Sequence, residues 1–406
     1  MLNNGTILTG MPMPFDNVSN APRVAIIHYW LVGMRGGEKV LESLCRMFPQ
    51  ADIFTHVYSP ENTSAALRRH NIHTTSVARL PFANRFYQRY LPFMPRALEE
   101  IDLTGYDLVI SSEAGPAKGV IVPPDVPHLC YCHSPMRYIW DQYHIYRSEM
   151  GRAARMVMPH IAHKLRGWDV TSAARVDGFV ANSNHVASRI NKYWRRASDV
   201  VFPPVAVQDF SPVHPADRGD FYLWAGELAP YKRPDIAVRA FRNLDKPLIV
   251  IGGPDRTVQS LKAFAGDKTT FLGKVPFDTL KSHMARCKAL VFPGEEDFGI
   301  VPVEVMASGR PVIAYGRGGA LDTVVDRKTG LLFQDQSVKG LEQAVREFEV
   351  EGLDMLPPIS LVRHAQGFNE AAFKRGIANS LESLGVKLDR FERISDGVEN
   401  LRADAG

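Results

Sequence analysis

Short runs of β-branched and other apolar residues alternate along the chain with stretches whose apolar residues recur at helical spacing. This alternation is typical of βα units stacked into parallel sheets, so the sequence predicts an α/β fold. In the first half of the chain, the predicted strands are 23–28, 52–57, 107–111, 128–132 and 178–181.

Residues 201–215 hold four prolines and show little helical periodicity, which indicates a linker between two domains. A second βα series follows, with predicted strands at 221–225, 248–251, 270–272, 289–292 and 312–314. We therefore expect two Rossmann-like, doubly wound domains, at 21–203 and 204–365. They should face each other across a cleft where ligands bind.

The composition is that of a globular protein with two cores. With 406 residues, the chain exceeds the usual size of a single core. Its net charge of +4 is too small to indicate a nucleic-acid-binding protein. Four cysteines without the spacing of zinc ligands predict a reduced, cytoplasmic protein. Residues 1–20 show no signal-peptide pattern and no apolar span, so any membrane contact is expected to be peripheral.

The strongest local signal is the segment 293–312, which predicts a strand, an acidic loop, a short helix and another strand. Pro302 suits the first turn of this helix and a Gly-x-Pro sequence ends it, so the amino end of the helix points free N–H groups into the loop. That end suits a phosphate. Glu296 on the loop and Glu304 on the helix can reach different hydroxyl groups of one elongated ligand. The alternative is that both carboxylates are merely solvated.

A second cluster, 226–234, follows the first predicted strand of the second domain. Lys232 and Arg233 precede a helix that Pro234 can open. Cations at the start of a helix are unfavourable on their own, and a bound diphosphate would relieve that cost. The alternative is a pair of ordinary surface cations.

Two segments of the first domain also suggest a ligand site. A turn containing Gly36 and Gly37 lets backbone N–H groups approach a ligand, although the G-x-G-x-x-G dinucleotide fingerprint is absent. His133 follows the predicted strand 128–132, at the sheet edge where active-site groups gather. A histidine at that place can equally be a hydrogen-bonded polar cap.

The segment from Glu296 to Pro311 resembles the signature of glycosyltransferase family 4, in which two glutamates separated by seven residues precede a Gly and Pro turn. The resemblance covers nearly the whole chain. It implies the GT-B fold, with two Rossmann-like domains and a helix near 371–384 that returns to the first domain. It also implies transfer of a sugar with retention of its anomeric configuration.

The same resemblance implies roles for single residues, with the first glutamate associated with the transferred sugar and the second with the ribose. The residues implied for catalysis are His133, Glu296 and Lys232. Those implied for donor binding are Gly226, Arg233, Gly299, Ile300, Val301 and Glu304. Gly36 and Gly37 would face the diphosphate and the acceptor. Glu227 stands where the family usually has a diphosphate-binding arginine, and Arg233 is the expected replacement.

The segment 316–324 places glycines ahead of another helix, in an ordinary βα turn or in the comparable Gly-Gly segment of the family. There the family usually has Glu at the position of Asp322. The sequence also lacks the Asp-x-Asp pair with which many sugar transferases hold a divalent ion on the donor diphosphate. Since fixed cations can replace such an ion, we expect no metal and no cofactor besides the nucleotide-sugar donor.

Between residues 79 and 96, four arginines alternate with aromatic and apolar residues, and no acidic residue intervenes. This mixture suits an anionic membrane surface. The alternative is a core helix with an arginine-rich outer face, broken by prolines. The residues expected to face the membrane or the acceptor are Arg79, Arg85, Phe86, Arg89 and Tyr90.

Within the family, residues 133–138 and 231–234 most resemble bacterial mannosyltransferases that build O-antigen and exopolysaccharide from GDP-mannose. The expected partners are then GDP-mannose, a lipid-linked glycan acceptor and the inner face of the cell membrane. Two alternatives stay open. One is a UDP-sugar donor such as UDP-glucose, and the other is a catalytically silent nucleotide-sugar-binding subunit.

Overall fold

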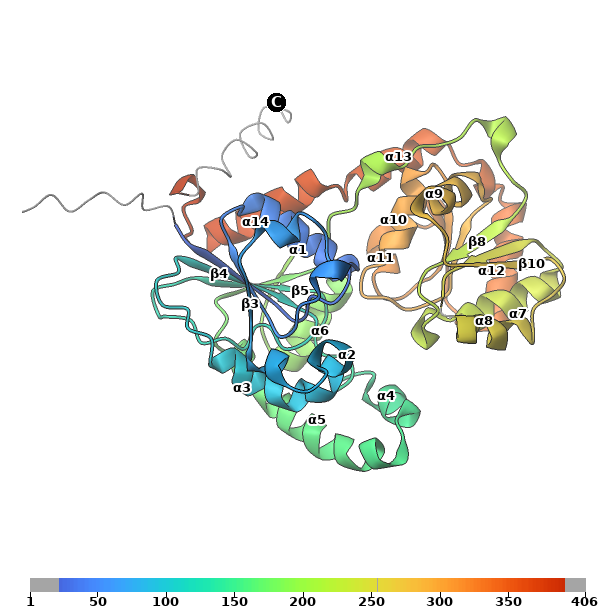
Figure 1. Cartoon of the computed structure of the whole chain (residues 1–406). Coiled ribbons are helices and arrows are strands. Elements are labelled where there is room, and N and C mark those ends of the chain that lie inside the picture. The colour runs from blue at the N-terminus through green and yellow to red at the C-terminus, as the bar shows by residue number, and fades with distance from the viewer. Residues whose placement is uncertain (1–21, 254, 391–406) are drawn as a thin grey trace, which may run out of the picture.

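The structure, a computed structural model, describes residues 22–253 and 255–390. Residues 1–20 and residue 21, where the predicted first domain begins, lie outside these ranges. The chain forms two α/β domains side by side, the first blue to green and the second yellow to orange in Figure 1. Each domain is built on one parallel sheet covered by helices.

The first sheet has seven strands, and every neighbouring pair in it is parallel. Their order in space is β3 (Ile72–Thr74), β2 (Asp52–Thr55), β1 (Val24–His28), β4 (Leu108–Glu113), β5 (His128–Cys132), β6 (Gly178–Ala181) and β7 (Asp199–Val200). The strands β1, β4 and β5 are buried along their whole length. This agrees with their continuous apolar sequence, which is typical of a sheet covered on both faces.

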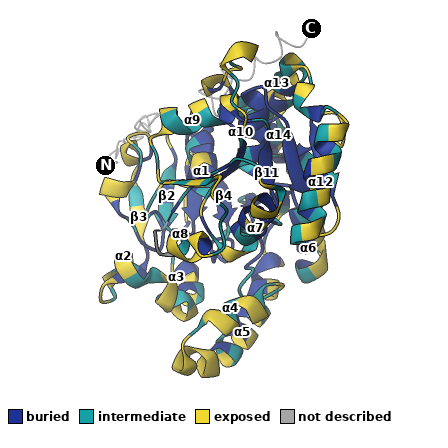
Figure 2. Ribbon diagram, turned by 90° about the vertical axis from the view of Figure 1, so that its right-hand side faces the viewer, coloured by how far each residue is buried: buried dark blue, intermediate teal, exposed yellow. Residues whose placement is uncertain are grey.

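The helices of the first domain include two pairs that project away from its sheet. The α-helices are α1 (Gly36–Met47), α2 (Ala83–Phe86), α3 (Met94–Glu99), α4 (Tyr143–Glu149), α5 (Arg152–Ala173) and α6 (Asn184–Trp194). The 3₁₀ segments η3 (Ser76–Arg79) and η4 (Tyr87–Phe93) flank α2. Figure 2 shows that α4 and much of α5 are exposed. We name residues 76–99 the α2–α3 arm and residues 143–173 the α4–α5 arm.

The second sheet has six strands, also parallel in every pair. Their order is β10 (Thr269–Gly273), β9 (Leu248–Ile251), β8 (Tyr222–Ala225), β11 (Leu290–Phe292), β12 (Val312–Tyr315) and β13 (Gly330–Phe333). The helices of this domain are α7 (Pro234–Leu244), α8 (Asp255–Lys262), α9 (Phe277–Arg286), α10 (Ile300–Ala307), α11 (Ala320–Thr323), α12 (Val338–Val350) and α13 (Pro358–Gln366).

The chain crosses between the domains twice. The proline-rich stretch 201–215 makes the first crossing without regular structure, apart from the 3₁₀ turns η5 (Val207–Asp209) and η6 (Pro215–Asp217). The last helix, α14 (Glu370–Ser383), then returns and lies beside α1 (Figure 1). Its residues Phe373, Ile377 and Leu381 belong to the same buried cluster as β1 and α1.

The predicted α/β class with two parallel sheets is confirmed, and all ten predicted strands are present with small shifts at their ends. Among the edge strands, β13 coincides with a strand-like run at 329–333, whereas β3 and β7 escaped the prediction. They have three and two residues, and their side chains are largely exposed, so they carry no apolar run to detect. In the part of the chain that the structure describes, no helix combines the length and the hydrophobicity that a membrane crossing requires.

The first domain contains a fully buried charge cluster. Lys118 forms ion pairs with Glu113, at 3.2 Å, and with Asp169. Glu113 also accepts backbone N–H groups of residues 117 and 118, and Asp169 accepts the indole N–H groups of Trp140 and Trp194. Burial works against the charge on Lys118, but the two carboxylates raise its pKa above the ordinary value. The cluster thus joins the end of β4 to α5 and α6.

Removing the cation should leave two buried carboxylates without a counter-charge. We expect Lys118→Met to lower the free energy of unfolding of the first domain by about 3–5 kcal/mol. The control is Lys268→Met, which deletes an exposed ion pair with Asp245 and should cost less than about 1 kcal/mol. Urea denaturation followed by circular dichroism measures both, and equal losses would contradict the prediction.

Candidate functional site

The order of the strands reverses direction at one point in each sheet, between β1 and β4 in the first and between β8 and β11 in the second. Loops that leave the carboxyl ends of strands at such switch points diverge and leave a crevice, which is where open α/β sheets bind ligands. The Gly36 turn follows β1, Lys232 follows β8 and Glu296 follows β11. His133 follows β5, which neighbours β4. Most of the predicted site residues therefore lie at these crevices.

The amino ends of α1 and α10 face each other across the domain boundary. A Cβ atom on Gly36 would lie 3.1 Å from the side chain of Ile300, and one on Gly37 would clash with the hydroxyl group of Tyr29. Gly299 enters α10 with φ of 87°, which favours glycine. The free N–H groups at the start of α10, at Ile300 and Val301, can bind an anion there.

Lys232 and Glu296 form an ion pair at this place. Nζ of Lys232 lies 2.8 Å from Oε1 of Glu296, and this buried oxygen has no further partner among the described residues. Burial opposes the charge on Lys232, and Glu296 raises its pKa above the ordinary value. Gly226 has φ of 149°, a backbone conformation that favours glycine, and a Cβ atom on Gly294 would clash with the Lys232 backbone. A partly buried charged pair at this place is suited to a polar ligand.

Glu304 lies on α10 and is buried. Burial raises the pKa of its carboxyl group, and Lys39 on α1, whose Nζ lies 4.0 Å from Oε1, acts in the opposite direction. The contact spans the two domains. A carboxyl group in this position can form a hydrogen bond with a hydroxyl group of a ligand bound between α1 and α10.

Arg233 is directed elsewhere in this structure. Its guanidinium group makes two hydrogen bonds of 3.0 Å to Asp235, on the first turn of α7. Asp235 raises the pKa of Arg233, while partial burial acts against it. Glu227, which occupies the usual arginine position, is exposed, and its negative charge helps to raise the pKa of Lys232. Lys232 is therefore the better placed of the two predicted cations.

His133 ends a chain of hydrogen bonds inside the first domain. Its Nε2 lies 2.9 Å from the hydroxyl group of Ser112, whose oxygen lies 3.0 Å from Nδ1 of His28. Nε2 of His28 in turn faces Glu38, 3.9 Å away. Burial and the neighbouring His28 lower the pKa of His133 to about 3, so its ring is neutral near pH 7.

The charge of Glu38 determines which atom donates in each of these hydrogen bonds. Burial works against ionisation, but His28 and backbone N–H groups lower the pKa of Glu38 below its ordinary value. An ionised Glu38 favours the proton of His28 on Nε2, so Ser112 donates to Nδ1 of His28 and accepts from Nε2 of His133. Nδ1 of His133 is then an unprotonated acceptor, with no hydrogen bond to any described residue. It can accept a hydrogen bond from a hydroxyl group of a ligand.

Asp297, next to Glu296, joins the two domains. Its carboxylate forms ion pairs with Arg137 and with Arg189, the latter at 2.9 Å. Although burial opposes its ionisation, these arginines lower the pKa of Asp297 below the ordinary value. The Arg137 guanidinium also lies 5.3 Å from the ring centre of Tyr231, the neighbour of Lys232. The acidic loop is thus fixed to the first domain by two cations.

A second bridge involves Asp322, on α11. It accepts hydrogen bonds from the backbone N–H of Asn184, at 3.0 Å, and from the side chain of Asn184, at 2.6 Å. Ahead of it, a Cβ atom on Gly318 or Gly319 would clash with the backbone of the acidic loop at 296–298. The glycine pair therefore allows α11 to support the loop that carries Glu296.

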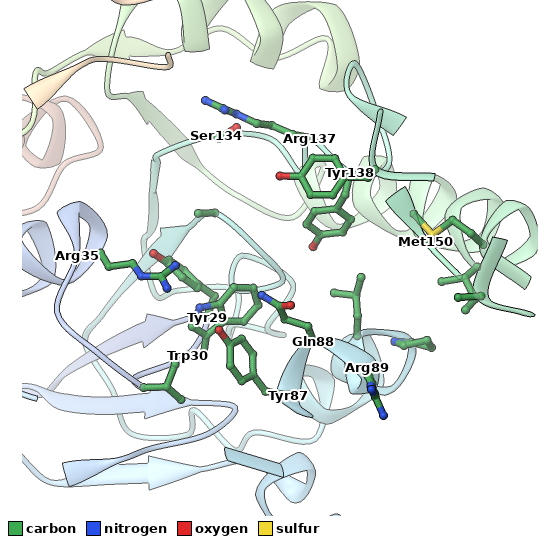
Figure 3. A pocket seen from close by; sticks show the side chains of 18 of the residues that line it. Tyr29, Trp30, Arg35, Tyr87, Gln88, Arg89, Ser134, Arg137, Tyr138 and Met150 are labelled. Carbon is green, nitrogen blue, oxygen red and sulfur yellow. The ribbon is translucent and has the colours of Figure 1, made fainter. Parts of the chain in front are cut away.

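A cavity of about 760 Å³ opens from this boundary into the first domain. Asp297 and Tyr231 of the second domain line it together with residues of the first, including the two helical arms. Figure 3 shows Tyr29, Trp30 and Tyr87 on one side, and Arg137 and Tyr138 across from them. The volume lies within the range of about 300–1,000 Å³ that is common for small-molecule sites.

The basic and aromatic segment forms the α2–α3 arm as four short helical pieces. Tyr87 and Tyr90 pack against a small core under the arm. Its outer surface carries exposed arginines at 79, 85, 89 and 96, together with Phe82 and Phe93, which are 76% and 61% exposed. The guanidinium groups of Arg85 and Arg89 lie 5.3 and 4.4 Å from the ring centre of Phe86. The arm therefore has an apolar inner face and an outer face that carries both arginines and phenylalanines.

Several residues of the site were missed by sequence reasoning. Asp297 lies in the acidic loop that the sequence predicted, but its partners Arg137 and Arg189 come from distant segments of the chain. Ser112, His28 and Glu38 lie at the ends of strands or inside a helix, where their residue types alone indicate nothing. They could have been predicted only by expecting ligand-site residues at the carboxyl ends of β1 and β4 as well as at that of β5.

The sequence matches two family profiles that together cover most of the chain. Residues 34–208 match the profile described as Glycosyltransferase Family 4, and residues 208–356 match the profile described as Glycosyl transferases group 1. The chain belongs to glycosyltransferase family 4. The two matches meet at residue 208, inside the proline-rich crossing, and together they include every predicted catalytic residue of the chain.

Curated relatives of the chain are distant. A GDP-mannose-dependent alpha-(1-6)-phosphatidylinositol monomannoside mannosyltransferase from Mycobacterium tuberculosis is 28% identical over 50% of this chain and 63% of its own length. A D-inositol 3-phosphate glycosyltransferase from Mycobacteroides abscessus is 30% identical over 47% of this chain and 45% of its own length. The chain thus spans about half to two thirds of the curated relatives that it matches.

Solved structures share the fold. Anabaena Alr3699/HepE, crystallised in complex with UDP-glucose, superposes with a TM-score of 0.65 over 89% of this chain and 99% of its own. The two sequences are 16% identical, so this likeness shows the GT-B fold alone.

The ion pairs of Asp297 should contribute stability that depends on pH in a defined direction. Because the folded pKa is lowered, the contribution is present above the unfolded pKa of about 3.9 and is lost as the pH falls through the folded pKa. We expect Asp297→Asn to lose about 2–3 kcal/mol, less than a fully buried pair because the side chains are partly exposed. The loss should be constant from pH 8 to pH 5.

Scanning calorimetry of the parent and the variant at several pH values measures this difference. The matched control is Asp220→Asn, since Asp220 pairs with Lys288 at an exposed position and its removal should cost less than about 1 kcal/mol. A deficit for Asp297→Asn that grows as the pH falls from 8 to 5 would refute the assignment.

Proposed function

We propose that the protein transfers a sugar from a nucleoside diphosphate donor to a glycan acceptor, with retention of configuration. The observation that carries the proposal is the partly buried Lys232 and Glu296 ion pair beside the free amino end of α10. This place offers a cation, backbone donors and a carboxylate within one crevice. Membership of glycosyltransferase family 4 supports this reading of the geometry.

We propose GDP-mannose as the donor, with its diphosphate at Lys232 and the start of α10, and its ribose at Glu304. The mannosyltransferase relative uses GDP-mannose, which supports the choice. The alternative is a UDP-sugar, favoured by the fold neighbour that was crystallised with UDP-glucose. Arg233 would contribute only if it left Asp235 on donor binding.

In the proposed reaction, the bond between the anomeric carbon and the diphosphate oxygen breaks. The acceptor oxygen bonds to the same face of that carbon, and its proton passes to the leaving diphosphate oxygen. Lys232 and the N–H groups of α10 stabilise the charge that develops on the leaving group. His133, through Nδ1, and Glu296 hold hydroxyl groups of the sugar in place. Because the charges are fixed in the protein, we propose that the reaction needs no metal ion.

A thermal-shift titration with GDP, UDP, GDP-mannose and UDP-glucose, each in EDTA, tests the donor. A ligand at 100 times its Kd stabilises the folded state by about 2.7 kcal/mol. We expect a rise in melting temperature with the two guanosine ligands and a much smaller rise in the Lys232→Met variant. A response to the uridine ligands alone would show that the donor is a UDP-sugar and not GDP-mannose. No response to any of the four ligands would refute the proposed function.

Turnover separates an enzyme from a silent binding subunit. We expect Glu296→Gln to keep the thermal response to the donor while GDP release in the presence of a membrane lipid extract falls about 10²-fold. The matched control is Glu295→Gln, since Glu295 is a more exposed carboxylate of the same loop, 3.9 Å from His185. Unchanged turnover in the Glu296→Gln variant would refute the catalytic role of Glu296.

We further propose a lipid-linked glycan as the acceptor, reached from the cytoplasmic face of an anionic membrane. The exposed arginines and phenylalanines of the α2–α3 arm support this, because a basic surface with protruding aromatic rings suits a membrane interface. Each cation near such a surface adds about 1 kcal/mol to binding.

Reversing two of these charges should release the protein from vesicles. We expect the double variant Arg85→Glu, Arg89→Glu to bind vesicles containing 30% phosphatidylglycerol at least about 30-fold more weakly than the parent. Arg239→Glu with Arg242→Glu, on exposed positions of α7, makes the same charge change far from the arm and should bind like the parent. Vesicle sedimentation measures both, and equal binding would exclude the arm as the contact.

A further inference from the structure

The cavity changes from polar to apolar along its length. At the domain boundary it is lined by Arg35, Glu38 and Asp297, beside the proposed donor site. Farther from the boundary its walls come from the two arms, with Leu91 and Pro92 on one side and Val157 and Ile161 on the other. Figure 3 shows Arg35 and Met150 on opposite sides of the space. A ligand that matches these walls has one polar end and one hydrocarbon end.

The apolar lining continues onto the outside of both arms. Val157, which lines the cavity, is 53% exposed, and its neighbour Met156 is 75% exposed. On the facing arm, Phe93 follows the lining residue Pro92. Exposed apolar side chains at the mouth of an apolar cavity are costly in water and favourable in a lipid surface. The mouth is therefore suited to a chain that enters from a membrane.

Two polar features of the walls also await a partner. The hydroxyl group of Tyr138 lines the cavity and is buried, and no described residue makes a hydrogen bond to it. Arg35 lines the cavity as well, and it forms no ion pair with any described carboxylate. An unpaired buried hydroxyl group is costly, and guanidinium groups bind phosphate well. The ligand thus carries both a hydrogen-bonding group and a negative charge.

We propose that this cavity holds the hydrocarbon chain of the acceptor, a single chain joined through phosphate to the glycan. The chain lies between the two arms, the phosphate lies near Arg35, and the sugar end reaches the domain boundary. The proposal rests on the proposed function and adds a binding subsite for the lipid part of the acceptor. Chain recognition and membrane attachment then use neighbouring surfaces of the same arms.

Titration calorimetry with farnesyl phosphate, kept below its micelle concentration and without donor, tests the subsite. We expect Val157→Glu, which places a carboxylate at the apolar wall, to weaken binding by about tenfold or more. The matched control is Val170→Glu, because Val170 is 40% exposed on the same helix and does not line the cavity. That variant should bind like the parent.

Two further probes separate the chain from the phosphate. Farnesol has the chain alone and glycerol phosphate has the phosphate alone, and each should bind about tenfold more weakly than farnesyl phosphate or worse. Absence of binding by farnesyl phosphate, or equal binding to the parent and Val157→Glu, would overturn the subsite. Farnesol binding as tightly as farnesyl phosphate would overturn the assignment to a phosphate-linked chain.

The thermal response to GDP-mannose distinguishes this inference from the proposed function. Val157→Glu should keep that response, since the residue lies away from Lys232 and Glu304. A normal donor response together with failed lipid titration refutes only the subsite. A missing donor response in the parent refutes the function itself, whatever the lipid titration gives.

Discussion

The geometry of the site depends on one ionic contact, the carboxylate of Asp297 held between Arg137 and Arg189. Asp297 follows Glu296 in the chain, and the two arginines belong to the first domain. The contact therefore fixes the position of the acidic loop, and with it the start of α10, relative to His133. Other polar contacts across the boundary, such as those of Lys39 and Asn184, are more exposed and hold the two sheets together less firmly.

Beneath this contact, buried polar networks make each half of the site rigid. In the first domain, the Lys118 cluster holds Glu113, and the carbonyl group of Glu113 accepts the backbone N–H of His133 at 2.8 Å. The hydrogen-bond chain through Ser112 then orients the His133 ring. In the second domain, the glycine pair at 318 and 319 lets α11 press against the acidic loop. Stability and ligand geometry thus share the same residues.

The sequence predicted the parts of the fold that depend on local pattern. Continuous apolar strands, the proline-rich crossing and the Gly-x-Pro end of α10 are all visible in one short window. Contacts between distant segments are not. The partners of Asp297 lie more than 100 residues away, the pairing of Arg233 with Asp235 depends on a backbone with φ of 52°, and the cavity exists only because two arms face each other. The family signature located Glu296 and Glu304 but could not supply these neighbours.

The return of α14 to the first domain has a consequence for biosynthesis. Phe373, Ile377 and Leu381 complete the core around β1 and α1, but the ribosome makes them only after the whole second domain. The first domain therefore emerges early with part of its apolar surface uncovered, while the second domain, from β8 to α13, can fold as a continuous unit. Chaperones that shield nascent chains would meet this protein with its first half still open.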